Sequence, residues 1–254
     1  SFADNKSFEG RNFIDPSCGS GAFLVELIHR LSKIGNYTIL DICQMVYGID
    51  INPVAVTAST ANYVLALLSA FSVDEFNSKD KQITIPVYLG DSMLSPTLIK
   101  DGQYSIPTSS GQIVYAENTT LVDFSLDPDR FDVSNKSNLS YARAQHKLSF
   151  IGKFTDMVGN PPWISWEHVS EGYKMKMKPT FLEKYSLYEK QGNDSRLGMG
   201  HDDICVAFMM ICADRFLEKD GRISLLLKQS IYQGEAHSLF RTLEIKKGDT
   251  CRLL

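Results

Sequence analysis

The chain has 254 residues, of which 43% are hydrophobic and 22% charged, and a formal net charge of −4. This length suits one large α/β domain, or one domain with a small appendage, and the composition is ordinary for a soluble globular protein. No continuous run of about 18 apolar residues occurs, so we predict no membrane span. The negative charge argues mildly against a chain that grips nucleic acid unaided, but not against a catalytic domain whose grip lies elsewhere.

The cysteines and histidines give no sign of a metal site. The five cysteines are scattered without a C-x-x-C pair, and the five histidines lack ligand spacing. We therefore predict neither bound metal nor disulfides, and a reducing compartment. The N-terminus, Ser1–Gly10, is polar and begins without Met, which predicts no signal peptide and suggests a fragment or a processed chain.

Short apolar runs alternate along the chain with segments of helical periodicity. The predicted strands are Arg11–Asp15, Met45–Ile51, Gln82–Leu89, Phe154–Val158 and Arg222–Leu227. The predicted helices are Ala22–Lys33, Val54–Phe71, one from Asp202 or Asp203 to Leu217, and Glu235–Lys246, with a last strand beginning at Cys251–Leu254. This alternation predicts a doubly wound, mostly parallel sheet with helices on both faces, the Rossmann-like α/β class.

Two segments interrupt the pattern. Residues 96–150 are rich in Ser, Asn, Asp and Gly, with a possible hairpin at Gln112–Phe124, and residues 164–200 are rich in Lys, Tyr and Gly. We interpret both as insertions in one catalytic domain that spans residues 1–254 and is itself incomplete.

A glycine-rich motif, Asp15-Pro-Ser-Cys-Gly-Ser-Gly-Ala-Phe23, follows the first strand and opens a helix. Glycines allow a tight turn and close approach of a ligand to the backbone. The acid ahead of the turn is a poor choice for cradling a pyrophosphate but suits a cationic ligand, such as the sulfonium and ammonium of S-adenosylmethionine. The alternative is a tight turn that Asp15 caps.

Two further acids end strands. Asp50, in Gly48-Ile-Asp-Ile-Asn-Pro53, can accept hydrogen bonds from both ribose hydroxyls of a nucleoside, and Ile51 can pack against its purine. Asp91, in Gly-Asp-Ser, can accept from the amine of the cofactor's adenine. Asp50 could equally cap the following helix, and Gly-Asp-Ser is also a common turn.

The motif Asn160-Pro161-Pro162-Trp163 follows the fourth strand. An aromatic amine is a poor nucleophile because its lone pair is delocalised into the ring. The Asn160 side-chain oxygen and the Pro161 carbonyl can accept from both N–H groups and free that lone pair, while the two prolines stiffen the backbone. Trp163 offers a flat face for an unstacked base. The alternative is a rigid turn beside a core tryptophan.

In this order, D-P-S-C-G-S-G-A-F, G-I-D-I-N-P, G-D-S and N-P-P-W resemble the adenine-specific DNA methyltransferases of restriction-modification systems, most of all the large type IIG and related phage-defence enzymes. The resemblance implies a class I methyltransferase fold and transfer from S-adenosylmethionine to a flipped adenine in double-stranded DNA. The implied catalytic residues are Asn160, Pro161, Pro162 and Trp163. The implied cofactor-binding residues are Asp15, Cys18, Gly19, Gly21, Asp50, Asp91 and Asn160.

The resemblance has gaps. It implies a further cofactor motif ahead of the glycine-rich turn, for which Ser1–Gly10 is too short, and Trp163 replaces a commoner tyrosine. We therefore interpret the chain as the catalytic core of a larger cytoplasmic protein, bacterial or archaeal, with recognition and possibly nuclease domains or subunits outside it. Methylation of RNA or of a protein glutamine amide remains an alternative, as does a non-catalytic DNA-recognition subunit.

Overall fold

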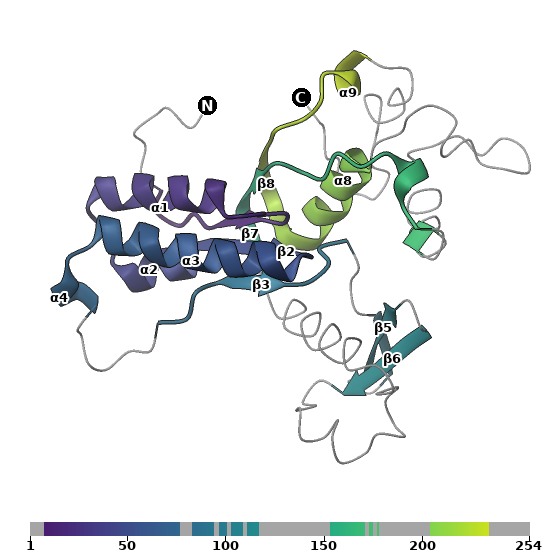
Figure 1. Cartoon of the computed structure of the whole chain (residues 1–254), viewed down its shortest axis with the longest axis horizontal. Helices are drawn as coiled ribbons and strands as arrows, with labels where there is room; N and C mark the ends of the chain where they lie inside the picture. Colours follow the sequence, from purple (N-terminus) through teal and green to yellow (C-terminus); the bar gives the residue numbers. More distant parts are fainter. Residues whose placement is uncertain are drawn as a thin grey trace, which may run out of the picture.

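A computed structural model describes residues 8–76, 83–93, 97–100, 103–108, 111–116, 153–170, 173–174, 177 and 204–233. Five strands form one sheet in which every pair is parallel, in the order β3-β2-β1-β7-β8 (Figure 1). These strands are β1 (Phe13–Asp15), β2 (Val46–Asp50), β3 (Val87–Leu89), β7 (Phe154–Gly159) and β8 (Leu217–Leu225). The chain winds outward from β1 to β3 and then returns to the other side of β1. The predicted doubly wound parallel sheet is confirmed, and its switch point lies between β1 and β7.

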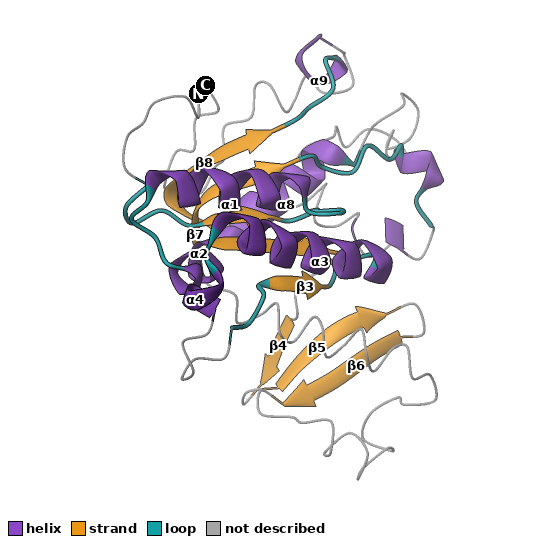
Figure 2. Cartoon of the chain, turned by 60° about the vertical axis from the view of Figure 1, so that its left-hand side comes forward, coloured by secondary structure: helices purple, strands orange, loops and turns teal. Residues whose placement is uncertain are grey.

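Helices cover both faces of this sheet. In Figure 2, α1 and α3 lie side by side in front of the strands. The longer helices are α1 (Ala22–Ile34), α3 (Pro53–Ala70) and α8 (Cys205–Phe216). The short ones are α2 (Ile39–Met45), α4 (Val73–Phe76), the 3₁₀ turn η2 (Trp166–His168) and α9 (Ser230–Gln233). One apolar cluster lies under α1, α2 and α3, and a second lies under α8.

The short strand β1 contributes to both apolar clusters. Phe13 packs in the cluster under α1, whereas the next residue, Ile14, packs in the cluster under α8. Neighbouring residues of a strand point to opposite faces, so a strand covered on both sides must be apolar at every position. This explains why β1 is a continuous apolar run that ends at Asp15, where the sheet stops and the turn begins.

Local signals explain where the helices begin. The Asn52 side chain accepts from the Val54 N–H at 2.9 Å, and Pro53 occupies the first helical turn of α3. Asn52, and not Asp50, is therefore the cap of this helix. Helix α2 was not predicted, although Thr38 and Asp41 form a reciprocal capping box at its start. That pair was the available sequence signal.

All five predicted strands differ from the structure in their bounds, and two of them begin five residues away from the predicted position. The third was predicted from Gln82, but β3 begins at Val87. Pro86 precedes it and has no N–H to donate to a neighbouring strand, although its carbonyl accepts from Gly48 N at 2.9 Å. Strand β8 begins five residues before the predicted Arg222, and its register shifts across a turn in which Asp220 has a φ of 64°.

Part of the predicted insertion at 96–150 forms a separate antiparallel sheet. Its strands are β4 (Thr97–Lys100), β5 (Gln103–Thr108) and β6 (Gly111–Ala116), in that order (Figure 2). Of the segment Gln112–Phe124, predicted as a hairpin or extra strands, residues 112–116 lie in strand β6, which pairs with β5. The rest of that segment, most of the 164–200 excursion, the helix Glu235–Lys246 and the strand at Cys251–Leu254 lie outside the described residues.

Within the described residues, one helix, α3, is long and apolar enough by length and composition to cross a membrane, with a mean hydropathy of 1.3. It buries Ser59, Tyr63, Ala66 and Leu67. A helix in the core of a soluble domain passes the same test, so α3 is weak evidence for a span. The absence of a membrane span stays a prediction.

A buried ion pair joins the chain ahead of β1 to β7. The Arg11 guanidinium contacts both oxygens of the Asp156 carboxylate, with Nε at 2.9 Å from Oδ2. The Asp156 side chain is 3% exposed, and Arg222 of β8 approaches it less closely, at 3.7 Å. Arg11 also lies over the rings of Phe8 and Phe13. The pair therefore ties together three adjacent segments of the sheet.

Removing Arg11 should destabilise the fold, because it leaves a buried carboxylate poorly compensated. We expect Arg11→Ala to lower the free energy of unfolding by about 3 kcal/mol, the lower end of the cost of breaking a buried pair. Arg30→Ala, which removes an exposed pair with Glu26 on α1, should cost less than about 1 kcal/mol. Urea denaturation of both variants measures the difference, and equal losses would contradict the role of this pair.

Candidate functional site

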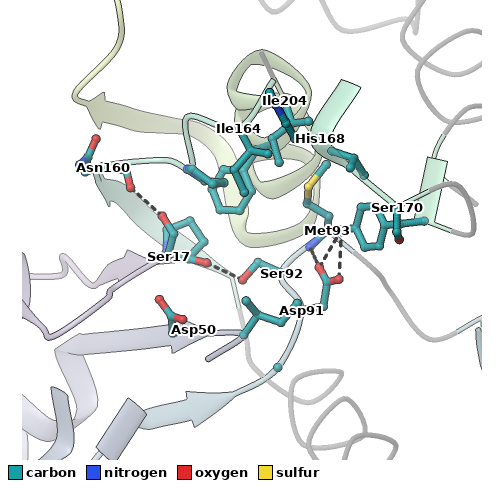
Figure 3. Close-up of a pocket in the computed structure, with 17 residues that line it drawn as sticks. Ser17, Asp50, Asp91, Ser92, Met93, Asn160, Ile164, His168, Ser170 and Ile204 are labelled. Carbon is teal, nitrogen blue, oxygen red and sulfur yellow. Dashed lines mark hydrogen bonds between the residues drawn. The ribbon is translucent and has the colours of Figure 1, made fainter. Parts of the chain in front are cut away.

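The turns that follow β1, β2, β3 and β7 meet at the carboxyl edge of the sheet around one cavity of about 440 Å³. Figure 3 shows residues from all four turns around it. The cavity wall includes five residues that the sequence predicted for the site: Asp50, Ile51, Asp91, Asn160 and Pro162. The motifs that follow four different strands therefore converge at one edge of the sheet.

Asp50 links the first two turns. Its Oδ2 accepts from the Gly19 N–H at 2.8 Å, and its Oδ1 accepts from the Asn52 N–H at 2.8 Å. The carboxylate is thus held between the glycine-rich turn and the start of α3, at the cavity wall. Ile51 beside it is 61% exposed. An exposed branched apolar side chain beside a fixed carboxylate can cover one face of a purine while the acid accepts from a ribose.

Asp15 lies behind this wall. Its carboxylate is buried, its Oδ1 accepts from the Ser17 N–H at 3.0 Å, and its Oδ2 has no hydrogen-bond partner. Burial, followed by the charge of Asp50, raises the pKa of Asp15 to about 7 against the lowering effect of the Ser17 N–H. A buried carboxyl of this kind gains from a nearby cation, because a positive charge offsets the cost of ionising it.

The glycine-rich turn depends on two left-handed glycines. Gly19 and Gly21 have φ of 54° and 88°, and a Cβ on Gly21 would lie 2.6 Å from Ser59 Oγ on α3. Cys18 is buried behind the turn, where its N–H donates to the Ile49 carbonyl at 2.9 Å. Burial and then the Asp15 carboxylate raise the pKa of the Cys18 thiol to about 12, so this thiol stays protonated near neutral pH. Cys18 therefore shapes the turn.

Asp91 closes the cavity from the β3 side. It is 4% exposed, its Oδ1 accepts from the Met93 N–H at 2.8 Å, and its Oδ2 accepts from the Tyr173 hydroxyl at 3.0 Å (Figure 3). The neighbouring Ser92 hydroxyl donates to the Pro16 carbonyl at 2.6 Å. The β3 turn is thereby joined to the turn after β1.

The Asn160-Pro-Pro-Trp loop is fastened to the same turn. The Ser17 hydroxyl donates to the Asn160 carbonyl at 3.1 Å (Figure 3). Pro161 is buried, whereas Trp163 is 48% exposed and lies outside the cavity wall. The ammonium of Lys228 lies 5.6 Å from the centre of the Trp163 ring, within the range of a cation–π contact. The exposed indole is therefore supported on the face that Lys228 covers.

Several residues of the cavity wall were not predicted. Met93, Ile164, Val169, Ile204 and Phe208 give it an apolar side, and Ser17, Ser92, His168, Ser170 and Tyr173 add polar groups. Ser17 and Ser92 stand inside the motifs, so their position was the signal. Met93 directly follows the Gly-Asp-Ser motif, and the others come from α8, from Ile204 just ahead of it, and from the excursion after Trp163. Nothing in their spacing marked them.

The charge of the wall fits a cationic nucleoside better than a phosphorylated one. The wall as described contains two aspartates and no lysine or arginine, and Asp15 lies just behind it. A pyrophosphate would meet carboxylates without a compensating cation, whereas the sulfonium and ammonium of S-adenosylmethionine would be attracted. The residues present therefore fit that cofactor. No group of three or more metal-ligating side chains occurs among the described residues.

A parallel sheet in this order, with an acidic crevice at its switch point and an Asn-Pro-Pro-aromatic loop on the crevice wall, defines a Rossmann-like methyltransferase. Residues 44–252 match the Eco57I restriction-modification methylase family. The chain belongs to this family.

Individual relatives agree with the family. The chain is 28% identical over 196 residues to the adenine-specific methyltransferase PglX of Streptomyces coelicolor, covering 71% of this chain and 14% of PglX. Among solved structures, a nuclease-deletion mutant of the Type ISP restriction-modification enzyme LlaGI, in complex with a DNA substrate mimic, gives a TM-score of 0.54 at 16% identity, covering 92% of this chain and 17% of that one.

The second and third structures are the ATP-dependent Type ISP enzyme LlaBIII bound to DNA and a DrdV–DNA complex. Their TM-scores are 0.54 and 0.50 at 15% identity, covering 94% and 92% of this chain and 14% and 19% of theirs. At this identity the likeness shows the fold. The chain spans less than a fifth of the length of these relatives.

The buried Asp15 predicts a specific dependence of stability on pH. The pKa of Asp15 is about 7 in the folded protein, against 3.8 for an ordinary aspartate side chain. Between these two pH values the folded state therefore keeps a proton on Asp15 that the unfolded state has lost. The free energy of unfolding should therefore fall as pH rises through this window. Asp15→Asn removes the titrating group. Measured against the unsubstituted chain, the free energy of unfolding of this variant should therefore rise by about 2–3 kcal/mol between pH 5 and pH 8.

Urea denaturation at both pH values, without added cofactor, measures this gain. Glu26→Gln on the exposed side of α1 is the matched control and should show no such change. A constant difference between Asp15→Asn and the unsubstituted chain would contradict the shifted pKa.

Proposed function

We propose that this chain carries the catalytic site of a DNA methyltransferase that transfers a methyl group from S-adenosylmethionine to the exocyclic amine of adenine. The observation that carries the proposal is the Asn160 loop on the wall of the same cavity that Asp50 and Asp91 line. A methyl donor in the acidic part would lie next to the acceptors that an aromatic amine needs. The membership of the Eco57I family and the similarity to PglX support the same reaction.

The acidic turns are proposed to bind the cofactor. Asp50 accepts from its ribose, Ile51 covers its purine, and Asp91 accepts from its adenine amine. Gly19 and Gly21 shape the turn beside its amino-acid part, and Cys18 packs that turn. Asp15 supplies negative charge behind it, so its carboxyl loses its proton as the cationic cofactor binds. When bound, the cofactor supplies an electrophilic methyl group on a positively charged sulfur.

The Asn160 loop is proposed to bind and activate the target amine. The Asn160 side-chain oxygen and the Pro161 carbonyl accept from its two N–H groups, and Pro162 restricts the backbone that presents them. Ser17 holds this loop against the cofactor turn through the Asn160 carbonyl. The two acceptors thereby keep the nitrogen at a fixed distance from the cofactor's methyl group. Positioning of this kind accounts for much of the rate enhancement of enzymes that join two substrates.

Adenine inside a duplex cannot reach this cavity, so the target base must be flipped out of the stack. Trp163 offers the exposed indole face against which the flipped base stacks, at about 1–3 kcal/mol per base. We propose duplex DNA as the partner, recognition and possibly nuclease domains or subunits beyond this chain, and a cytoplasmic setting. The DNA complexes of LlaGI, LlaBIII and DrdV support this arrangement through their shared fold.

A tritium-transfer assay tests the acceptor class. Tritiated S-adenosylmethionine and the protein are incubated separately with duplex DNA, RNA and protein acceptors. We expect label in DNA, recovered as N6-methyladenine after enzymatic digestion. Label only in RNA or in a protein glutamine would overturn the DNA assignment, and label in no acceptor would overturn the transferase assignment.

Cofactor affinity is expected to depend on Asp50. Losing a hydrogen-bonded charge partner typically costs about 1.5–3 kcal/mol, so Asp50→Ala should weaken S-adenosylmethionine binding by about one to two orders of magnitude. Asn52→Ala in the same turn is the control, because it removes a helix cap and keeps the N–H that Asp50 accepts. Calorimetry should show that the control changes affinity less than about threefold, well below the loss of one hydrogen bond to a charge. Unchanged affinity in Asp50→Ala would refute the ribose role.

Asn160→Ala is expected to abolish methylation while leaving cofactor affinity within a few-fold. Alanine removes one acceptor and leaves an N–H of the target amine unpaired, so the loss should fall mainly on kcat. Trp163→Ala should weaken capture of the flipped base instead, and Trp163→Tyr, which keeps a stacking face, should largely restore it. Single-turnover kinetics on duplex DNA separate the two steps. Near-normal turnover in Asn160→Ala would contradict the catalytic role of the loop and leave it as a rigid turn only.

A further inference from the structure

Tyr173 contributes to the cavity from a part of the chain in which no motif was recognised. It follows the Asn160 loop and η2, and it reaches the cavity wall together with Val169 and Ser170. Its ring packs against the apolar cluster under α8. The phenol is thus placed by packing, and its hydroxyl reaches a carboxylate of the cavity wall.

That carboxylate is Asp91. The Tyr173 hydroxyl lies 3.0 Å from Asp91 Oδ2 and 3.3 Å from Asp91 Oδ1, so it donates to the edge of the carboxylate. The Met93 N–H donates to Oδ1 from the backbone of the same turn, at 2.8 Å. A side-chain donor and a backbone donor therefore set the plane of this buried carboxylate from two directions.

The backbone of the Asp91 turn is held separately. Arg215 of α8 donates from one guanidinium nitrogen to the carbonyls of Asp91 and Ser92, at 3.3 and 3.1 Å. The Ser92 hydroxyl in turn donates to the Pro16 carbonyl. Loss of the Tyr173 hydroxyl would therefore leave the turn in place and remove one of the donors that orient the carboxylate, which separates orientation from folding.

We propose that Tyr173 is a positioning residue that orients Asp91 to select a purine with an amine at its 6-position. The inference rests on the proposed cofactor site. A carboxylate held in one orientation accepts a hydrogen bond from the 6-amine of adenine. The 6-carbonyl of hypoxanthine has no hydrogen to donate, so its oxygen and the carboxylate oxygen repel each other. Sites built to bind a donor reject an analogue without it strongly, because the buried acceptor is left unpaired. If the carboxylate can rotate, both purines are accommodated and the discrimination weakens.

The experiment compares S-adenosylhomocysteine with S-inosylhomocysteine, its deaminated counterpart, by calorimetry on the intact protein. The unsubstituted protein should prefer the adenosyl compound by at least about 100-fold, and Tyr173→Phe should reduce this preference about tenfold, the scale of one hydrogen bond to a charged group. The phenylalanine keeps the ring that packs under α8. Tyr37→Phe is the matched control, because Tyr37 packs in the other apolar cluster, between α1 and α2.

A double-substitution cycle tests whether Tyr173 acts through Asp91. In an Asp91→Asn background, Tyr173→Phe should change the affinities for S-adenosylhomocysteine and S-inosylhomocysteine by no more than about twofold each. The reason is that Tyr173 acts through the Asp91 carboxylate, so the effects of the two substitutions are not independent. An unchanged preference in Tyr173→Phe alone, or an equal effect in both backgrounds, would overturn the inference while leaving the cofactor site standing. Failure of the unsubstituted protein to bind S-adenosylhomocysteine would overturn the cofactor site, and the inference with it.

Discussion

The close approach of Gly159 to the Asp15 carboxylate is the contact on which the site depends. Gly159 ends β7 with a φ of 147°, and a Cβ at this position would overlap the carboxylate. Since β1 pairs with β7 on one side and β2 on the other, the glycine lets the Asn160 loop start directly against the glycine-rich turn. Any larger residue would move the proposed amine acceptors away from the proposed methyl donor.

Negative charge organises the rest of the cavity. Asp15 and Asp50 end two adjacent strands and Asp91 follows a third, and burial, with the charge of Asp50 as a lesser cause, raises the pKa of Asp15. Asp50 and Asp91 reduce the cost by accepting backbone N–H groups of their own turns, whereas Asp15 keeps one oxygen unpaired. The fold therefore leaves one oxygen of Asp15 without a hydrogen-bond partner, next to the turn that the two left-handed glycines form. A nearby cation would offset the cost of ionising this buried carboxyl.

The loop proposed to bind the target and the turns proposed to bind the cofactor are joined by side chains as well as by the sheet. Ser17 holds the Asn160 carbonyl, Ser92 holds the Pro16 carbonyl, and Tyr173 reaches Asp91 from beyond the loop. These links place the two halves of the proposed reaction on one rigid edge. Trp163 is different, because it is half exposed and Lys228 lies over its ring, which is compatible with the proposed capture of a base from outside.

The sequence by itself determined the class of fold and which turns meet at the cavity, because each motif occupies one strand and the turn after it. Parallel strands bring such turns to one edge whatever lies between them. Boundaries were harder, since Pro86 precedes and shortens β3 and the Thr38–Asp41 capping box starts a helix of only 7 residues, too short for a repeating apolar pattern. Only the tertiary structure could decide that Asp15 lies behind the wall and that Tyr173 reaches Asp91. Those facts depend on packing between residues far apart in the chain, which no local pattern records.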